Sequence, residues 1–115
     1  DIERGGSFAS IVGTMELIEK KYVDLVQGFI INKFRGDIEI LKPGYKKLQQ
    51  KTGLPALGTI PMTKFDIPDE DSIGNSPKNL NWNSSNLKKL DMEINKIAKV
   101  VKSSLNIRKV EKLLK

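Results

Sequence analysis

Asn32 and Lys33 are the residues whose type and position best suit binding chemistry. They follow directly on the unbroken apolar run of Phe29, Ile30 and Ile31, which favours a strand buried on both faces. Ligands of open parallel sheets bind where strands end and loops begin. We therefore expect a ligand near the Asn32 amide and the Lys33 ammonium. A buried strand that simply ends in a solvated loop is the alternative, since most strand ends bind nothing.

The absence of two residue types excludes several classes of catalyst. The 115 residues contain no cysteine and no histidine. This rules out a disulfide framework, a thiolate zinc site and any Ser-His, Cys-His or histidine-metal centre. Carboxylates, lysines, hydroxyls and backbone amides remain for any chemistry. No apolar run reaches membrane-spanning length and no secretory signal is evident, so we predict a soluble, cytoplasmic protein without a membrane partner.

The opening segment, Asp1-Ile-Glu-Arg-Gly-Gly, is a second cluster of groups suited to binding. Gly5 and Gly6 allow backbone N–H groups to approach an anion closely, and Ser7 is suited to begin a helix whose N-terminus favours negative charge. A simple turn is the alternative. From Phe8 the spacing of apolar residues predicts one helix with a face for a sheet. These residues are Ile11, Val12, Met15, Ile18 and Tyr22.

Residues 26–60 predict a βαβ unit. Residues 23–31 form the first clear strand, and residues 55–61, bracketed by prolines, form the second. Between them Asp37 is placed to cap a helical segment, Pro43 restarts it in a first turn, and Gly53 ends it. Its buried face comprises Leu41, Tyr45 and Leu48. Parallel strands joined by a right-handed crossover are therefore expected.

A linker and a pair of helices follow this unit. Residues 62–85 are rich in Pro, Asp, Asn, Ser and Gly, which is typical of a loop. Residues 69–71 within it are all acidic and are better explained as an exposed turn than as a metal site, since no ligand pattern accompanies them. An amphipathic stripe and a recapping Asn106 then predict two helices. We divide the chain into residues 1–73, a linker over residues 74–86, and C-terminal amphipathic helices over residues 87–115.

The net charge of +6 is concentrated at one end of the chain. Residues 1–85 hold 11 basic and 11 acidic side chains, whereas residues 86–115 hold 9 and 3. Lysine-rich outer faces of helices are common, and no aromatic residues interleave with this patch. We therefore predict no nucleic-acid partner.

Several motifs together resemble cobyric acid synthase, a glutamine-dependent enzyme of cobalamin biosynthesis whose synthetase domain is similar to dethiobiotin synthetase and belongs to the P-loop ATPases. They are Asp1-Ile-Glu-Arg-Gly-Gly-Ser-Phe-Ala9, Gly28-Phe-Ile-Ile-Asn-Lys-Phe-Arg-Gly-Asp37, Pro43-Gly-Tyr, Thr52-Gly-Leu-Pro and Leu57-Gly-Thr-Ile-Pro61. The likeness covers about residues 1–73. It implies an α/β fold, in which a partial P-loop-type parallel sheet carries flanking helices and a C-terminal amphipathic helix pair.

The resemblance also implies a reaction and a set of roles. The family amidates peripheral carboxylates of a corrinoid, cobyrinic acid a,c-diamide, using ATP, Mg²⁺ and ammonia from glutamine. By motif match Asp1 would be the acid near Mg²⁺, and Arg4, Gly5 and Gly6 would lie beside phosphate or substrate. Asn32 and Lys33 would lie near the nucleotide base.

Three departures from the family pattern limit what this chain is expected to do. Ser7 replaces a residue that is more often apolar, and no Gly-Lys-Ser or Gly-Lys-Thr loop occurs. The Cys-His-Glu set of the glutaminase cannot be built. The helix from Leu90 onward resembles the one that closes the whole enzyme. We therefore expect a truncated or internally deleted fragment that is inactive alone and binds no cofactor.

Two other functions stay open at this point. One is a different P-loop amidoligase or ATPase of the dethiobiotin synthetase type. The other is a non-enzymatic module that binds a partner through its C-terminal helices. Self-association through the exposed sheet or these helices is expected for a partial sheet.

Overall fold

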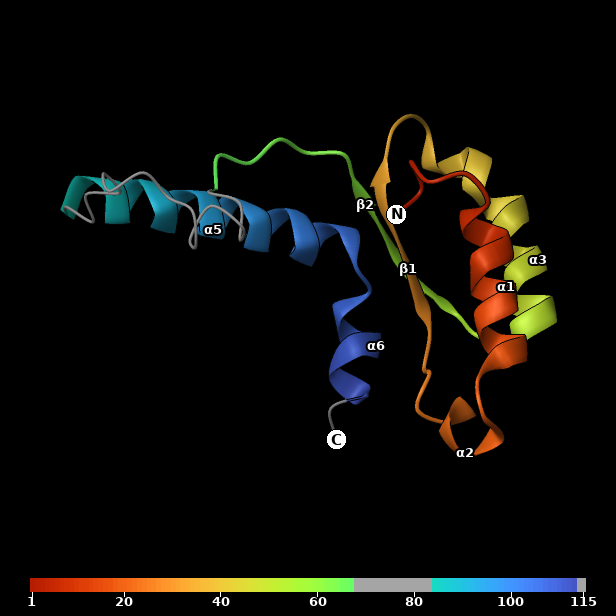
Figure 1. The fold of residues 1–115 in the computed structure, drawn as a ribbon. Coiled ribbons are helices and arrows are strands. Elements are labelled where there is room, and N and C mark those ends of the chain that lie inside the picture. Colours follow the sequence, from red (N-terminus) through yellow and green to blue (C-terminus); the bar gives the residue numbers. More distant parts are fainter. Residues whose placement is uncertain (68–83, 114–115) are drawn as a thin grey trace.

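The computed structural model describes residues 1–67 and 84–113. Two strands, β1 (Phe29–Phe34) and β2 (Ala56–Pro61), form a parallel sheet. Figure 1 shows α1 (Ser7–Leu17) and α3 (Lys42–Thr52) on one side of this sheet, with α5 (Ser84–Ser104) and α6 (Ile107–Lys112) on the other. The short helices α2 (Lys20–Val23) and η1 (Ile38–Leu41) precede β1 and α3. The predicted α/β class is confirmed.

The βαβ unit forms as predicted. Asp37 caps η1, since its carboxylate accepts a hydrogen bond from the Glu39 N–H at 2.9 Å. Pro43 lies in the first turn of α3, where its missing N–H leaves no hydrogen bond unmade. Gly53 ends α3 with a φ of 73°, a left-handed conformation that glycine adopts without a Cβ clash.

The core lies between β1 and the helices α1 and α3. Phe29, Ile31 and Leu48 are 7%, 2% and 3% exposed, and Leu41 and Leu54 complete the buried cluster. Tyr45 packs edge-on against Phe29 and hydrogen-bonds the buried Thr59 hydroxyl. Burial of its ring raises the pKa of the Tyr45 phenol above its ordinary value, and the hydrogen bond to Thr59 partly opposes this rise.

The first helix and the first strand differ from their predictions. The predicted helix stops at Leu17 because Ile18 is extended, and α2 is a separate turn. A turn follows α2, closed by the hydrogen bond from the Val26 N–H to the Val23 carbonyl, and the strand begins only at Phe29. It then extends to Phe34, because pairing with β2 reaches Pro61.

Two consequences follow for the expected site. Asn32 and Lys33 lie within β1 and not in the loop after it. The strand is also not buried on both faces, since Ile30 is 40% exposed. The apolar run at Phe29, Ile30 and Ile31 therefore did not show whether the strand has a solvent-facing side. The burial of each face depends on which distant elements of the chain pack against it.

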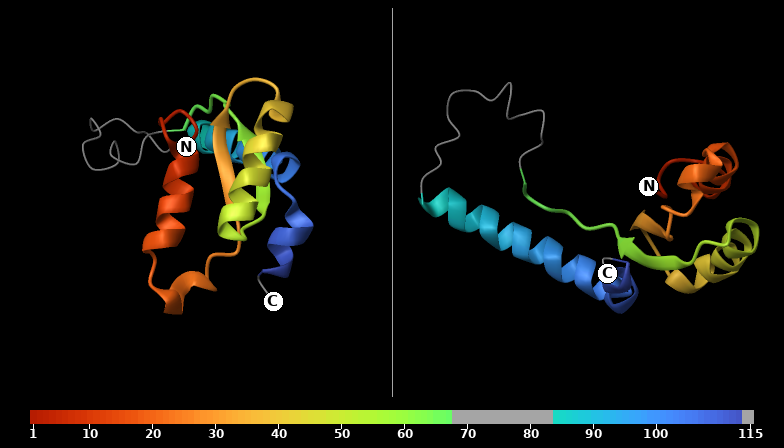
Figure 2. Two further views of the ribbon diagram at one scale, coloured as in Figure 1. Left: turned by 90° about the vertical axis from the view of Figure 1, so that its right-hand side faces the viewer. Right: turned by 90° about the horizontal axis from the view of Figure 1, so that it is seen from below.

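The C-terminal helices form where the apolar stripe predicts them, with α5 beginning at Ser84 and Asn106 capping α6. The right-hand view of Figure 2 shows α5 projecting from the sheet. An extended segment, residues 62–67, runs beside it. There Asp66 pairs with Lys89 at 2.5 Å, and the Lys89 ammonium lowers the pKa of the Asp66 carboxyl. No helix of the described residues is both long and apolar enough to cross a membrane.

The acidic residues 69–71 lie outside the described residues. Within the residues that are described, no group of three or more Asp or Glu side chains is arranged to hold a metal ion.

Candidate functional site

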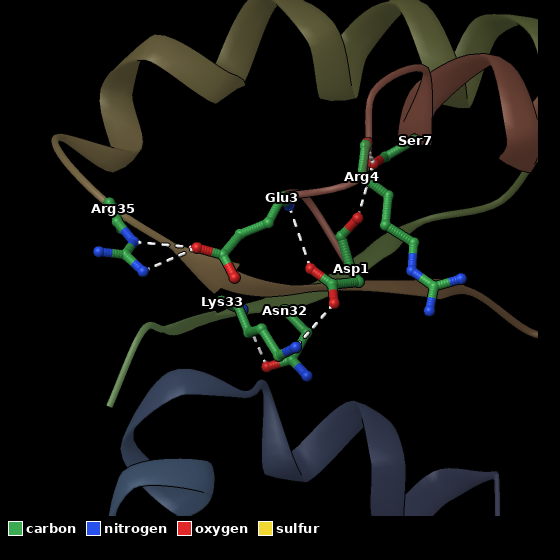
Figure 3. A network of polar contacts seen from close by, with 7 residues as sticks. All are labelled: Asp1, Glu3, Arg4, Ser7, Asn32, Lys33 and Arg35. Carbon is green, nitrogen blue, oxygen red and sulfur yellow. Dashed lines mark hydrogen bonds and ion pairs between the residues drawn. The ribbon is translucent and has the colours of Figure 1, made fainter. Parts of the chain in front are cut away.

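The two sequence motifs meet at the carboxyl end of β1 (Figure 3). The Lys33 ammonium lies 2.8 Å from a carboxylate oxygen of Asp1, and the two side chains are 44% and 26% exposed. The second Asp1 oxygen accepts the Glu3 N–H at 3.1 Å. Asp1 and Lys33 are 32 positions apart in sequence and nevertheless form one charged cluster. The two sequence motifs therefore contact each other in the folded chain.

A second ion pair runs beside the first. The Arg35 guanidinium donates from Nε and Nη2 to one oxygen of Glu3, at 3.1 and 2.8 Å. The backbone N–H of Ile2 donates to the Asn32 carbonyl at 3.0 Å. The sequence analysis did not select Glu3 and Arg35. Their separation of 32 residues equals that of Asp1 and Lys33, so a contact between Asp1 and Lys33 would have predicted this second pair.

Local backbone geometry explains how these groups come together. Gly6 adopts a φ of 77° at the entry to α1, and the Ser7 hydroxyl donates to the carbonyls of Asp1 and Arg4 at 2.7 and 2.5 Å. These bonds close residues 1–6 into a turn over the end of β1. Lys33 has a φ of 60°, which is rare for a residue with a side chain and costs about 1–2 kcal/mol. Nothing in the sequence marks this conformation.

Of the remaining predicted residues, Arg4, Gly5 and Gly6 line two grooves. Arg4 borders both, one of about 340 Å³ against β1 and one of about 330 Å³ beside Gly5 and Gly6. Its guanidinium makes no hydrogen bond or ion pair with any side chain drawn in Figure 3. Asn32 is exposed, and its side-chain oxygen accepts the Lys33 N–H at 2.9 Å. The structure thus brings the predicted residues to one end of the sheet.

These residues fit part of a Mg²⁺ and phosphate site. Mg²⁺ is held by one or two carboxylates together with waters and substrate phosphates, and Asp1 can supply one such carboxylate. Arg4 can supply a cation of the kind that phosphate oxygens require. The 115 residues contain no Gly-rich loop ending in Gly-Lys-Ser or Gly-Lys-Thr to cradle the phosphates.

The comparison with curated proteins decides the relationship. A probable cobyric acid synthase of Methanosarcina barkeri is 53% identical over 87 residues, which cover 76% of this chain and 18% of the relative. The chain is related to the cobyric acid synthases. A probable cobyric acid synthase of Thermococcus kodakarensis is 54% identical over 78 residues, 68% of this chain and 16% of the relative. The cobyric acid synthase of Desulforamulus reducens is 48% identical over 101 residues, 87% of this chain and 19% of the relative.

The matches cover only a small part of each relative. The chain spans less than a fifth of the length of these cobyric acid synthases. No protein-family model matches the chain. No solved structure matches it either.

Proposed function

We propose that this chain is a fragment of the ATP-dependent synthetase unit of a cobyric acid synthase and is inactive alone. In the complete enzyme the reaction would amidate carboxylates of cobyrinic acid a,c-diamide, with glutamine as the ammonia source. The observation that carries this proposal is the meeting of the two motifs, at Asp1 and Lys33, in a chain about half identical to cobyric acid synthases. Residues 1–73 belong to the synthetase unit in this proposal, residues 74–86 to a linker and residues 87–115 to C-terminal helices.

The proposed roles follow from the chemistry at the end of β1. ATP would supply the phosphoryl group that activates a carboxylate for attack by ammonia. Asp1 would hold Mg²⁺, with Arg4 and the Gly5-Gly6 turn beside phosphate or substrate. Asn32 and Lys33 would face the nucleotide base. Two observations support these roles. Asn32 is exposed, and the Arg4 guanidinium forms no ion pair or hydrogen bond with the other side chains drawn in Figure 3. Both side chains can therefore contact a ligand.

A chimaera tests the proposal. Residues 1–61 replace the matching segment of the Desulforamulus reducens cobyric acid synthase, and corrinoid amidation is measured with ATP and glutamine. We expect kcat/KM within about tenfold of the parent enzyme, which corresponds to about 1.4 kcal/mol of transition-state stabilisation. A chimaera that folds, by circular dichroism, but does not amidate would contradict the proposal.

Calorimetry on the chain alone tests the second part of the proposal. We expect no MgATP binding in the micromolar range, since the phosphate loop is not among these 115 residues. Micromolar ATP binding with turnover would show that the loop is dispensable and that the chain is an enzyme by itself.

A binding role for the C-terminal helices is a second candidate function. The apolar residues Leu87, Met92 and Ile94 of α5 are 48%, 71% and 50% exposed. Exposed apolar area of this kind favours contact with a partner or a second copy. Light scattering after gel filtration measures the molar mass in solution. A mass above the 12.9 kDa of the monomer supports self-association, and a monomer up to high concentration contradicts it.

A further inference from the structure

The turn between α5 and α6 lies against the outer edge of β2 (Figure 1). The Asn106 N–H donates to the Leu57 carbonyl at 2.8 Å, and Leu105 forms an antiparallel bridge with Gly58. Within residues 1–67 and 84–113, no third strand pairs with β2. Residues 104–106 therefore take the position that a third strand would occupy.

Gly58 makes this close approach possible. A Cβ at this position would fall against the Ser104 carbonyl oxygen and the Leu105 Cα, so a larger residue would hold the turn away from the strand. Glycine inside a strand often marks a site where another backbone comes close. Leu57 beside it is buried and Leu105 is half-buried. The turn and the strand thus meet backbone against backbone, with apolar side chains beside the contact.

The part of β2 that can pair with a further strand is short. Pro55 precedes the strand and Pro61 ends it, and proline has no N–H to donate to a ladder. The Leu57 carbonyl faces the outer edge, and because alternate residues of a strand point the same way, the backbone groups of Thr59 face it too. The bridge at Gly58 lies between these two residues. The turn therefore covers the segment where a further strand would form its hydrogen bonds.

The direction of the turn indicates what would compete for this edge. Leu105 and Gly58 pair in the antiparallel sense. Two copies of one strand that are related by a two-fold axis also pair antiparallel, because each presents the same surface to the other. An exposed strand edge is a template for such pairing. The β2 strand of a second copy would therefore approach in the same sense as the turn.

We propose that the outer edge of β2 is a strand-pairing surface, which residues 104–106 occupy from within the chain in place of a second copy. Because α5 ends at Ser104 and α6 begins at Ile107, the turn offers no further extended residues to a ladder. It fills the edge without extending the sheet, which is one way in which proteins protect a strand edge from association. This role concerns the 115-residue chain itself and does not depend on the proposed nucleotide site.

Asn106→Pro in the full chain tests this surface. Asn106 has a φ of −76°, which proline can adopt, but proline lacks the N–H that bonds to Leu57. The matched control is Asn106→Ala, which keeps this N–H. Both variants lose the side-chain cap that accepts the Lys109 N–H at 3.1 Å, so this loss is common to the two. Hydrogen exchange of the Thr59 amide is measured by NMR over a range of protein concentrations, and light scattering measures the molar mass.

The outcomes are distinct. We expect exchange at Thr59 to be faster by about tenfold or more in Asn106→Pro at low concentration, and unchanged in Asn106→Ala. Raising the concentration of Asn106→Pro should slow this exchange again and bring the molar mass to about twice that of the monomer. Equal exchange in the two variants would overturn the proposal. So would fast exchange in Asn106→Pro that no concentration slows, or a mass that rises equally in both variants and the unchanged chain.

A second variant releases the turn through a different contact. Gly58→Val should displace it by a clash with Ser104 and should give the same changes at Thr59. The Phe29 N–H, which donates to the Pro55 carbonyl at 3.0 Å inside the sheet, shows by its protection that each variant is folded. Exchange at Thr59 that stays as slow in folded Gly58→Val as in the unchanged chain, at low concentration, would overturn the proposal.

Discussion

The α/β unit and helix α5 bury their apolar residues to different degrees. Ile31 and Leu48 in the unit are 2% and 3% exposed, whereas Leu87 and Ile94 in α5 are about half exposed. The Cα radius of gyration is 17.7 Å, against about 13 Å expected for a compact domain of this length. Both regions have well-spaced apolar residues, so the pattern alone does not determine burial; burial also requires an opposing surface.

The largest effect is expected from the core of the α/β unit. Leu48→Ala leaves a cavity beneath α3 and should lower the free energy of unfolding by about 2–5 kcal/mol. Urea unfolding followed by circular dichroism measures this. Ile94→Ala on the half-exposed face of α5 is the matched control and should change the free energy by no more than about 0.5 kcal/mol. Equal losses in the two variants would show that α5 is as well buried as the core.

A smaller effect is expected where α5 meets the sheet. A Cβ on Gly58 would fall against the Ser104 carbonyl and the Leu105 Cα, so Gly58→Val should separate the α5–α6 turn from β2. We expect faster exchange of the Asn106 amide, at a cost of about 1–3 kcal/mol. Gly5→Ala, whose Cβ would meet nothing within 4 Å, is the control. Unchanged exchange at Asn106 in the Val variant would mean that the turn does not depend on this close approach.

The smallest effect is confined to alkaline pH. The raised pKa of Tyr45 means that its contribution to stability is fully present below the ordinary phenol value of about 10 and is lost as pH rises through the higher folded value. Tyr45→Phe should remove this part of the alkaline loss and should cost about 1 kcal/mol at neutral pH, because Thr59 loses its partner. Melting temperatures of the unchanged chain and of the Tyr45→Phe variant, recorded from pH 7 to 11, show whether Tyr45 causes this loss. Parallel curves would contradict the assignment to Tyr45.

The elements with strong local signals could be predicted from sequence. Asp37, Pro43 and Gly53 bound η1 and α3 through their own backbone preferences, and the stripe of α5 has the period of a helix. The start of β1 was wrong because Val23, although suited to a strand, ends helix α2, and Val26 lies in the turn that follows it. Pairing with β2, and not local preference, fixes where β1 begins and ends.

The candidate site was predictable only in part. Asp1 and Lys33 were chosen from separate motifs, and the sequence could not show that their side chains touch. The Glu3–Arg35 pair joins residues 32 positions apart, and the left-handed backbone at Lys33 coincides with an irregularity in the pairing of β1 with β2. Such contacts follow from the packing of the segment over residues 1–6 against β1, which no local pattern encodes.

The central claim is that the end of β1 belongs to the nucleotide site of a cobyric acid synthase. Its most direct measurement compares Lys33→Gln with Arg35→Gln in the Desulforamulus reducens chimaera. We predict that Lys33→Gln raises the KM for ATP by about tenfold or more, as expected for a lost charge-assisted contact of about 1.5 kcal/mol or more. Arg35→Gln, which removes a pair that only braces the turn, should leave this KM within about twofold. An unchanged KM for ATP in the Lys33 variant, or equal changes in both variants, would contradict the claim.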